Sequence, residues 1–270
     1  MALNDNQKRN SKRGYPFLFG TTSYIIPDDI IPNVRMLSGI VDDIELVLFE
    51  SPDVSNIPTV SDIRELKSIA DDNDCGFTVH LPTGRKAGSA EKKERELFID
   101  DAKRIINRCS PLQPGAWIVH LEGIEKNVSM AEITTWEARC SGVIEELCGE
   151  VENPSRLAIE NLGYPWYWHL NIAAQAGVSL CCDIGHLWLY YPECWKEYAA
   201  AMITETRVIH LHGVSGGKDH ISLARNDSFQ LEDFIGILVN TQYKGIITIE
   251  IFNEMDLTES REVFAQLWEK

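Results

Sequence analysis

Eight short apolar runs recur along the chain, and a helix-like segment follows each of them. The runs are nearly continuous in hydrophobic residues, which is typical of parallel strands buried on both faces. A repeated strand–helix unit of this kind predicts a closed parallel barrel inside a ring of helices. The eight runs lie at 17–22, 43–50, 76–81, 116–121, 157–162, 178–185, 207–213 and 246–252.

The spacing between the runs predicts helices and leaves no room for a second domain. An open, doubly wound sheet is the alternative, but no glycine-rich dinucleotide fingerprint follows the first run, which weakens it. We therefore predict a single (β/α)8 TIM barrel over residues 15–270, after a disordered, polar and basic tail at 1–14 that lacks the apolar core of a secretory signal. Helices are expected at about 28–37, 61–70, 90–107, 130–147 and 258–269.

Composition limits the partners of this chain. The formal net charge is −16, which argues against binding to the nucleic acid backbone and favours a small-molecule substrate. No apolar stretch approaches the roughly 20 residues that span a bilayer, so no membrane contact is expected. The seven cysteines show no metal-type spacing. Free thiols fit a reducing cytoplasm, and the oligomeric state is left open.

Titratable residues gather where the predicted strands end, which is the end of a TIM barrel that carries catalytic residues. Of the seven histidines, only His169 lies elsewhere, and we assign it a structural role. The others belong to the following set, in chain order: His80, His120, Glu160, Asp183, His186, His210, His212, Asp219, His220 and Glu250.

Imidazoles and carboxylates in one place predict a metal centre. A lone histidine at a strand end is more often structural, and a lone buried glutamate more often pairs with a cation. Here the coincidence recurs on six of the eight predicted strands, which offer few lysines or arginines. Zinc, manganese and iron accept this mixture of ligands, and a cation would relieve the repulsion between carboxylates.

The segments "AIENL", "CDIGH", "VIHLHG" and "IITIEIF" occur in an order and spacing that resemble the xylose-isomerase-like barrels. That superfamily includes apurinic endonuclease type enzymes, sugar epimerases and sugar-phosphate isomerases. The resemblance implies that Glu160, Asp183, His210 and Glu250 hold a metal ion shared by both branches.

The nuclease-like branch adds further ligands, and the resemblance maps them onto His80, His120 and His186. It also adds an Asp/His pair after the seventh strand, which matches Asp219–His220. These two residues are adjacent here, whereas the nuclease pattern has one residue between them. The expected complement is therefore one to three zinc or manganese ions.

Two other segments, "GTTSYIIPDDIIPNVRML" and "VDDIELVLFES", resemble the cobamide-remodelling phosphodiesterases, which open the nucleotide loop of a corrinoid. This resemblance implies a metal-dependent hydrolase with Glu160 bridging two ions and Glu250 beside it. His186 and the Asp219–His220 pair would hold another ion, or orient and protonate the leaving oxygen.

Three other functions are compatible with the sequence. A sugar isomerase or epimerase would use one metal while Glu160 and Glu250 exchange protons with substrate carbon, but it would leave several histidines without a metal role. A DNA-repair endonuclease fits the charge of −16 poorly. A catalytically silent ligand-binding barrel would be expected to have lost some of the four shared ligands.

The aromatic stretches "GYPWYWH" and "HLWLYYPECW" follow the fifth and sixth predicted strands. Large rings at that end of the barrel are suited to stacking on a flat substrate, although packing of the next helices is the competing explanation. The residues predicted to bind substrate are Trp166, Trp168, Trp188, Tyr190, His212 and Lys218.

Overall fold

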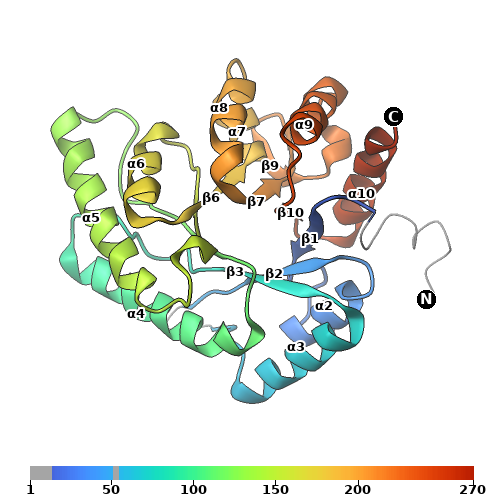
Figure 1. The fold of residues 1–270 in the computed structure, drawn as a ribbon, viewed down its shortest axis with the longest axis horizontal. Helices are drawn as coiled ribbons and strands as arrows, with labels where there is room; N and C mark the ends of the chain where they lie inside the picture. The colour runs from blue at the N-terminus through green and yellow to red at the C-terminus, as the bar shows by residue number, and fades with distance from the viewer. Residues whose placement is uncertain (1–13, 51–54) are drawn as a thin grey trace.

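A closed barrel of eight parallel strands forms the centre of the molecule, as the sequence predicts (Figure 1). The computed structural model describes residues 14–50 and 55–270, so the predicted tail at 1–14 lies, except for Gly14, outside the described residues. Around the barrel the strands follow the order β1-β10-β7-β6-β5-β4-β3-β2. Their bounds are β1 Leu18–Thr22, β2 Asp43–Val47, β3 Gly76–His80, β4 Trp117–Val119, β5 Leu157–Glu160, β6 Ser179–Asp183, β7 Thr206–Leu211 and β10 Ile246–Ile249.

Helices surround the barrel and cover its outer surface (Figure 1). Two of them begin with capping boxes, at Thr59 and Ser129. In each, the hydroxyl accepts a main-chain N–H from the first turn, and an acidic side chain in that turn accepts the main-chain N–H of the capping residue. The helices are α2 Ile30–Leu37, α3 Val60–Asn73, α4 Lys92–Cys109, α5 Met130–Cys148, α6 Tyr167–Ala176, α7 Ile184–Tyr190, α8 Trp195–Met202, α9 Ser228–Thr241 and α10 Glu254–Trp268.

Two insertions depart from the simple strand–helix repeat. Two helices, α7 and α8, follow β6. A hairpin of β8 Gly213–Ser215 and β9 Lys218–Ile221 follows β7, where, apart from Gly213, none of the eight predicted strands lies. The hairpin turns at Gly216 and Gly217, both with positive φ, which glycine adopts without steric cost. The hairpin brings Asp219 and His220 back over the end of β7.

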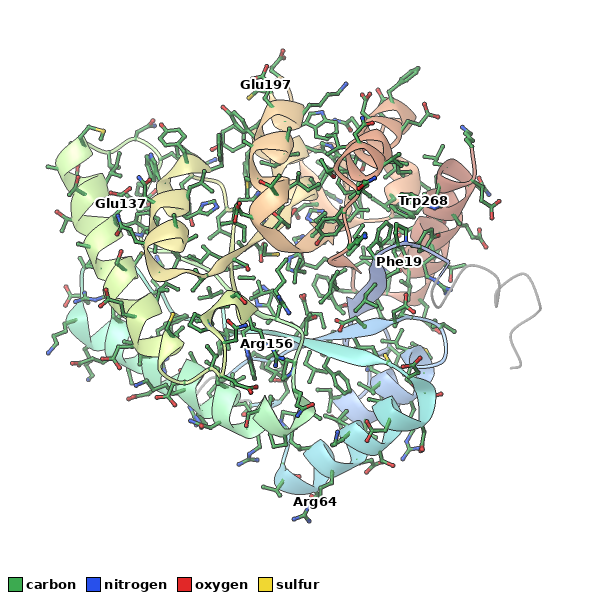
Figure 2. All side chains as sticks on the ribbon, in the orientation of Figure 1. Phe19, Arg64, Glu137, Arg156, Glu197 and Trp268 are labelled. Carbon is green, nitrogen blue, oxygen red and sulfur yellow. The ribbon has the colours of Figure 1, made fainter. Side chains whose placement is uncertain are left out.

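Two hydrophobic clusters show which strand positions face inward. The larger one lies between barrel and helices and includes Cys182, whereas a small one inside the barrel includes Cys181 and Val208. Adjacent strand residues such as these two cysteines therefore point to opposite faces. Side chains fill the space between the layers, with Phe19 buried in it and Arg64 exposed on the outer surface (Figure 2).

The two ends of the barrel differ in chemistry. A cavity of about 220 Å³ lies at the amino ends of the strands and is lined by Asp43, Gly76, Phe77 and Ile246 among others. The histidines lie at the carboxyl ends. Within the described part of the chain, no helix has the length and apolar character that crossing a membrane requires.

Candidate metal centre

Strand parity brings the predicted metal ligands together inside the barrel. Glu160 ends β5 and Asp183 ends β6, while His210 lies in β7 and Glu250 directly follows β10. All four are buried, and each offers one ligand atom within 4.8 Å of the others. The four residues implied by the family resemblance therefore form one compact group.

Glu160 also belongs to a second group of three, with His80 and His120. Its Oε2 atom lies 2.9 Å from Nε2 of His120, 3.4 Å from Nε2 of His80 and 3.3 Å from Nδ1 of His210. A carboxylate that faces two sets of ligands at once is placed to bridge two cations.

The imidazoles balance the buried negative charge. Burial alone would raise the pKa of Glu160, but His120 and His210 beside it hold that pKa well below its usual range. Burial opposes protonation of His120, yet the Glu160 and Glu122 carboxylates raise its pKa to about 10. The site is thus built to bind positive charge.

Main-chain carbonyls fix the tautomers of two histidines, although His80 turns Nε2 toward Glu160 whereas His186 has Nδ1 nearest to Asp183. Nδ1 of His80 donates to the carbonyl of the next residue at 2.8 Å, and Nδ1 of His186 donates to the carbonyl of Asn161 at 3.0 Å. Since a carbonyl only accepts, the Nε2 atoms keep their lone pairs. Ligating histidines are held in this way in many metal sites.

Asn161 also fixes the strand end that carries Asp183. Its amide oxygen accepts the main-chain N–H of Asp183 at 2.7 Å, and its amide nitrogen donates to the carbonyl of the same residue at 2.9 Å. The Asp183 carboxylate in turn accepts the main-chain N–H of His186 at 2.7 Å, and this contact caps the amino end of α7. Asn161 is part of the "AIENL" segment, but its role was not predicted.

Glu45 is a residue of the candidate centre that was not predicted from the sequence. It is fully buried in β2, and its Oε2 accepts from Nε2 of His210 at 3.0 Å, which leaves Nδ1 of His210 facing Glu160 and Glu250. The signal was present, because Asp43 and Glu45 alternate with apolar residues and therefore share the inward face.

Three buried polar atoms of this centre lack a hydrogen bond among the described residues: Oε1 of Glu45, Nδ1 of His210 and Oε2 of Glu250. Nδ1 of His210 and Oε2 of Glu250 lie only 3.0 Å apart without forming one. Unsatisfied buried donors and acceptors are rare, and a divalent cation between them would satisfy them. The residues therefore fit a metal ion chemically as well as in position.

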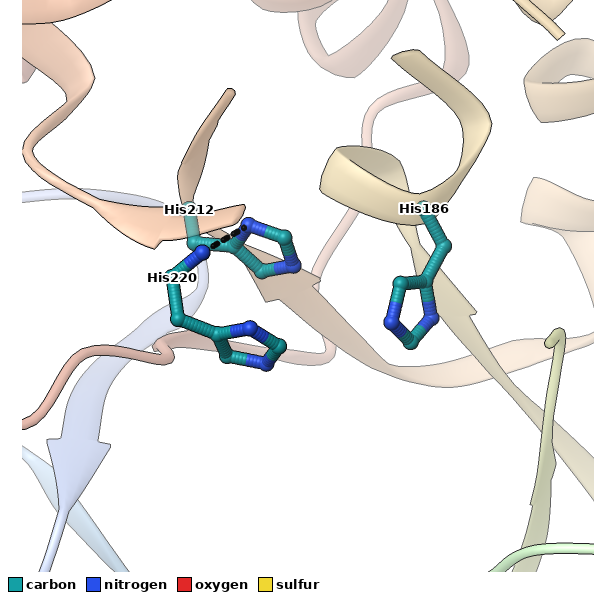
Figure 3. A group of neighbouring side chains, drawn as sticks. All are labelled: His186, His212 and His220. Carbon is teal, nitrogen blue, oxygen red and sulfur yellow. Dashed lines mark hydrogen bonds between the residues drawn. The ribbon is translucent and has the colours of Figure 1, made fainter. Parts of the chain in front are cut away.

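A third group consists of His186, His212 and His220, whose rings meet at the end of β7 (Figure 3). Asp219, which we predicted to bind metal with His220, lies outside it. Its side chain is 37% exposed and contacts Nδ1 of His220 at 3.3 Å. His212 was expected to contact substrate, and its ring is fully buried in this arrangement.

Two of the four aromatic residues predicted to contact substrate are packed in the interior. Trp168 stacks on Tyr164 with ring centroids 5.9 Å apart, and Trp188 packs edge-on against Trp195 at 5.8 Å; both tryptophans are buried. Both lie in the large core cluster, and Trp188 packs α7 against α8, which is the packing alternative. Trp166 is half-buried beside its neighbours. Lys218 is exposed on β9.

Tyr190 and Phe252 do lie beside the histidines with exposed rings. The Tyr190 ring is 5.8 Å from His186, and the Phe252 ring stacks 5.6 Å from His220. Nζ of Lys126 lies 4.2 Å from the Tyr190 ring centroid, so a cation accompanies the aromatic ring. Neither Phe252 nor Lys126 was singled out from the sequence, because both lie outside the aromatic stretches.

A family model described as "Xylose isomerase-like TIM barrel" matches residues 40–267. The chain belongs to this family. The match covers the strands that carry every residue of the three groups, from Glu45 to Glu250. A comparison with curated proteins found no match.

Solved structures agree on the fold. A D-tagatose 3-epimerase-like protein superposes with a TM-score of 0.75 at 18% identity, over 94% of this chain and 97% of that one. A 3-keto-D-glucoside 4-epimerase from E. coli superposes with a TM-score of 0.72 at 12% identity, over 94% of this chain and 100% of that one. Endonuclease IV from Thermus thermophilus superposes with a TM-score of 0.70 at 14% identity, over 93% of this chain and 99% of that one. Fold similarity of this kind spans several chemistries.

Proposed function

We propose that this protein is a metal-dependent hydrolase that cleaves a phosphodiester in a small molecule. The observation that carries the proposal is the shared carboxylate of Glu160, which faces two sets of ligands. A one-metal reaction has no need of the set formed by His80 and His120. The two sets that meet at Glu160 are His80 with His120, and Asp183 with His210 and Glu250.

The ligand chemistry supports zinc or manganese at this centre. Bound there, divalent ions supply an activated water and charge stabilisation for the phosphoryl oxygens. The protein residues hold the ligand geometry, with Glu45 orienting His210 and Asn161 orienting Asp183. His186 and His220 lie at the rim, where a protonated imidazole can donate to the leaving oxygen.

We propose a corrinoid as the substrate, specifically its nucleotide loop. This choice rests on the resemblance of residues 20–37 and 41–51 to the cobamide-remodelling phosphodiesterases. The exposed rings of Tyr190 and Phe252 would suit a bulky, partly flat molecule, and Lys126 would suit its phosphate. The net charge of −16 disfavours a DNA substrate.

A sugar epimerase is the second candidate, and one feature favours it. Glu160 and Glu250 both approach Nδ1 of His210, at 3.3 and 3.0 Å, so two carboxylates flank a single metal position. Such a pair is suited to removing and returning a proton on substrate carbon.

The test is to incubate protein loaded with zinc or manganese with a complete cobamide and to measure release of its nucleoside. Glu160→Gln should reduce the rate by more than about 100-fold, because loss of residues that merely orient ligands already costs about 10- to 100-fold. The matched control is Glu146→Gln, which removes an exposed carboxylate paired with Lys103. Epimerisation of a ketose without nucleoside release would favour the second candidate instead.

A further inference from the structure

His212 occupies an unusual position for a residue of the metal centre. It is fully buried, and its ring lies between the first turn of α7 and the β8–β9 hairpin. On one side a Cβ atom added to Gly185 would lie 2.1 Å from Cε1 of His212, so only glycine leaves space for the ring. On the other side the ring of His220 stacks on it, with centroids 4.1 Å apart and planes inclined by 14°.

Both nitrogens of His212 already have partners. Nδ1 lies 3.0 Å from the main-chain nitrogen of His220, drawn as the dashed line in Figure 3. Nε2 lies 3.3 Å from both oxygens of the Asp183 carboxylate. The carbonyl of Gly213 is also 3.3 Å from Nδ1, but the N–H of His220 is closer.

The first of these contacts determines the tautomer. A main-chain N–H can only donate, so Nδ1 of His212 must accept through its lone pair. The neutral ring then carries its proton on Nε2 and donates it to Asp183. A histidine ligates a metal through a nitrogen that has a free lone pair, and neither nitrogen of His212 offers one.

We propose that His212 is a positioning residue and not a ligand, although its ring lies among those of His186 and His220. Its Nε2–H orients the Asp183 carboxylate toward the metal position. Its Nδ1 holds His220, whose φ of 51° is in the left-handed region that residues other than glycine seldom adopt. One imidazole thus connects the β6 end of the centre to the hairpin that follows β7.

The tautomer can be measured directly in metal-free protein. Long-range proton–nitrogen correlation spectra of protein labelled with ¹⁵N-histidine distinguish the two nitrogens, and His212→Gln identifies the signals of His212. We expect an unprotonated Nδ1 and a protonated Nε2, unchanged when Cd²⁺ is added. Coupling of ¹¹³Cd to either nitrogen, or a proton on Nδ1, would overturn the proposal.

Zinc competition with a chromophoric chelator provides the second readout. His212→Ala should weaken binding by about 10- to 100-fold without changing the number of ions bound, which is the usual effect of losing a residue that orients a ligand. His212→Gln should retain affinity within a few-fold, because its amide N–H can donate to Asp183. Loss of one whole equivalent in both variants would show a ligand, and unchanged affinity in both would show no role.

The consequence for metal binding rests on the proposed metal centre, but the tautomer does not. If the wild-type protein binds no metal, the proposed function fails while the spectra still decide the state of His212. If His212→Ala does not fold, the glutamine variant and the wild-type spectra remain informative.

Discussion

At the scale of single residues, the centre is organised by carboxylates that each have a distinct task. Oε2 of Glu160 faces three histidines, Asp183 receives a main-chain N–H from α7, and Glu45 orients His210 from across the barrel. Removal of any one would leave buried partners unsatisfied, which costs more than the lost contact itself. The same logic applies to a buried carboxyl group at the other end of the barrel.

That group is Asp43, which faces the cavity at the amino ends of the strands. Burial raises its pKa from 3.8 to about 7, against the opposing hydrogen bond from Thr78. The folded protein therefore keeps this proton up to about pH 7, whereas the unfolded chain loses it near pH 3.8. The free energy of unfolding should fall as the pH rises through this window and then level off.

Asp43→Asn keeps a neutral side chain of similar shape at every pH. We expect its melting temperature to rise relative to wild type between pH 5 and pH 8. The corresponding difference in the free energy of unfolding should level off at about 4 kcal/mol above pH 7. Asp71→Asn, which alters an exposed carboxylate lining the same cavity, is the control and should show no such trend. A constant difference between Asp43→Asn and wild type across this range would contradict the assignment.

How far single residues could be predicted depended on where they lie in a strand. Glu160, Asp183 and Glu250 stand at strand ends, where position alone marks them. Glu45 stands inside an apolar run, so its inward direction becomes informative only once the register is known. Burial of Trp168 and Trp188 could not be predicted, because an aromatic ring after a strand serves packing and binding equally well.

At the scale of elements, glycine determines how closely α7 approaches the end of β7. Gly185 lies in the first turn of α7 against the ring of His212, and an added Cβ would come within 2.1 to 2.4 Å of three ring atoms. A buried ring held by two hydrogen bonds cannot move aside without losing them. Helix α7 and the metal centre are therefore coupled through this contact.

Gly185→Ala should displace His212 and lower zinc affinity by about 10-fold or more. The control is Gly142→Ala in α5, where an added Cβ meets nothing within 4 Å. That variant should bind zinc normally and gain about 0.5–1 kcal/mol from reduced backbone entropy in the unfolded state. Competition titrations with thermal unfolding measure both effects, and equal zinc affinity in the two variants would argue against the coupling.

Periodicity predicted the barrel strands and most of the helices, but not the β8–β9 hairpin. The hairpin is short and polar, so it has no apolar alternation to reveal it, and its two glycines mark a turn without specifying paired strands. The strands are also shorter than the apolar runs, since β2 ends at Val47 and β4 at Val119. Pairing stops there while burial continues into the loops.

At the scale of the whole molecule, the closed barrel gathers side chains from strands that are far apart in sequence. Residues that lie far apart in the sequence are in hydrogen-bond contact, such as Glu45 and His210, which are 165 positions apart. The order of the strands is enough to predict a single barrel of this family, but it does not determine which reaction the barrel catalyses. Epimerases and an endonuclease share this fold at similar TM-scores, so the number of metal ions is the property that separates the proposed chemistries.

The most direct measurement is therefore elemental analysis of gently purified protein. The proposed hydrolase should contain two or three equivalents of zinc or manganese, and His80→Ala combined with His120→Ala should remove one while the fold is retained. A single, easily exchanged equivalent that the double variant keeps would contradict the two-metal centre, as would a wild-type protein that binds no metal and folds equally well with a chelator.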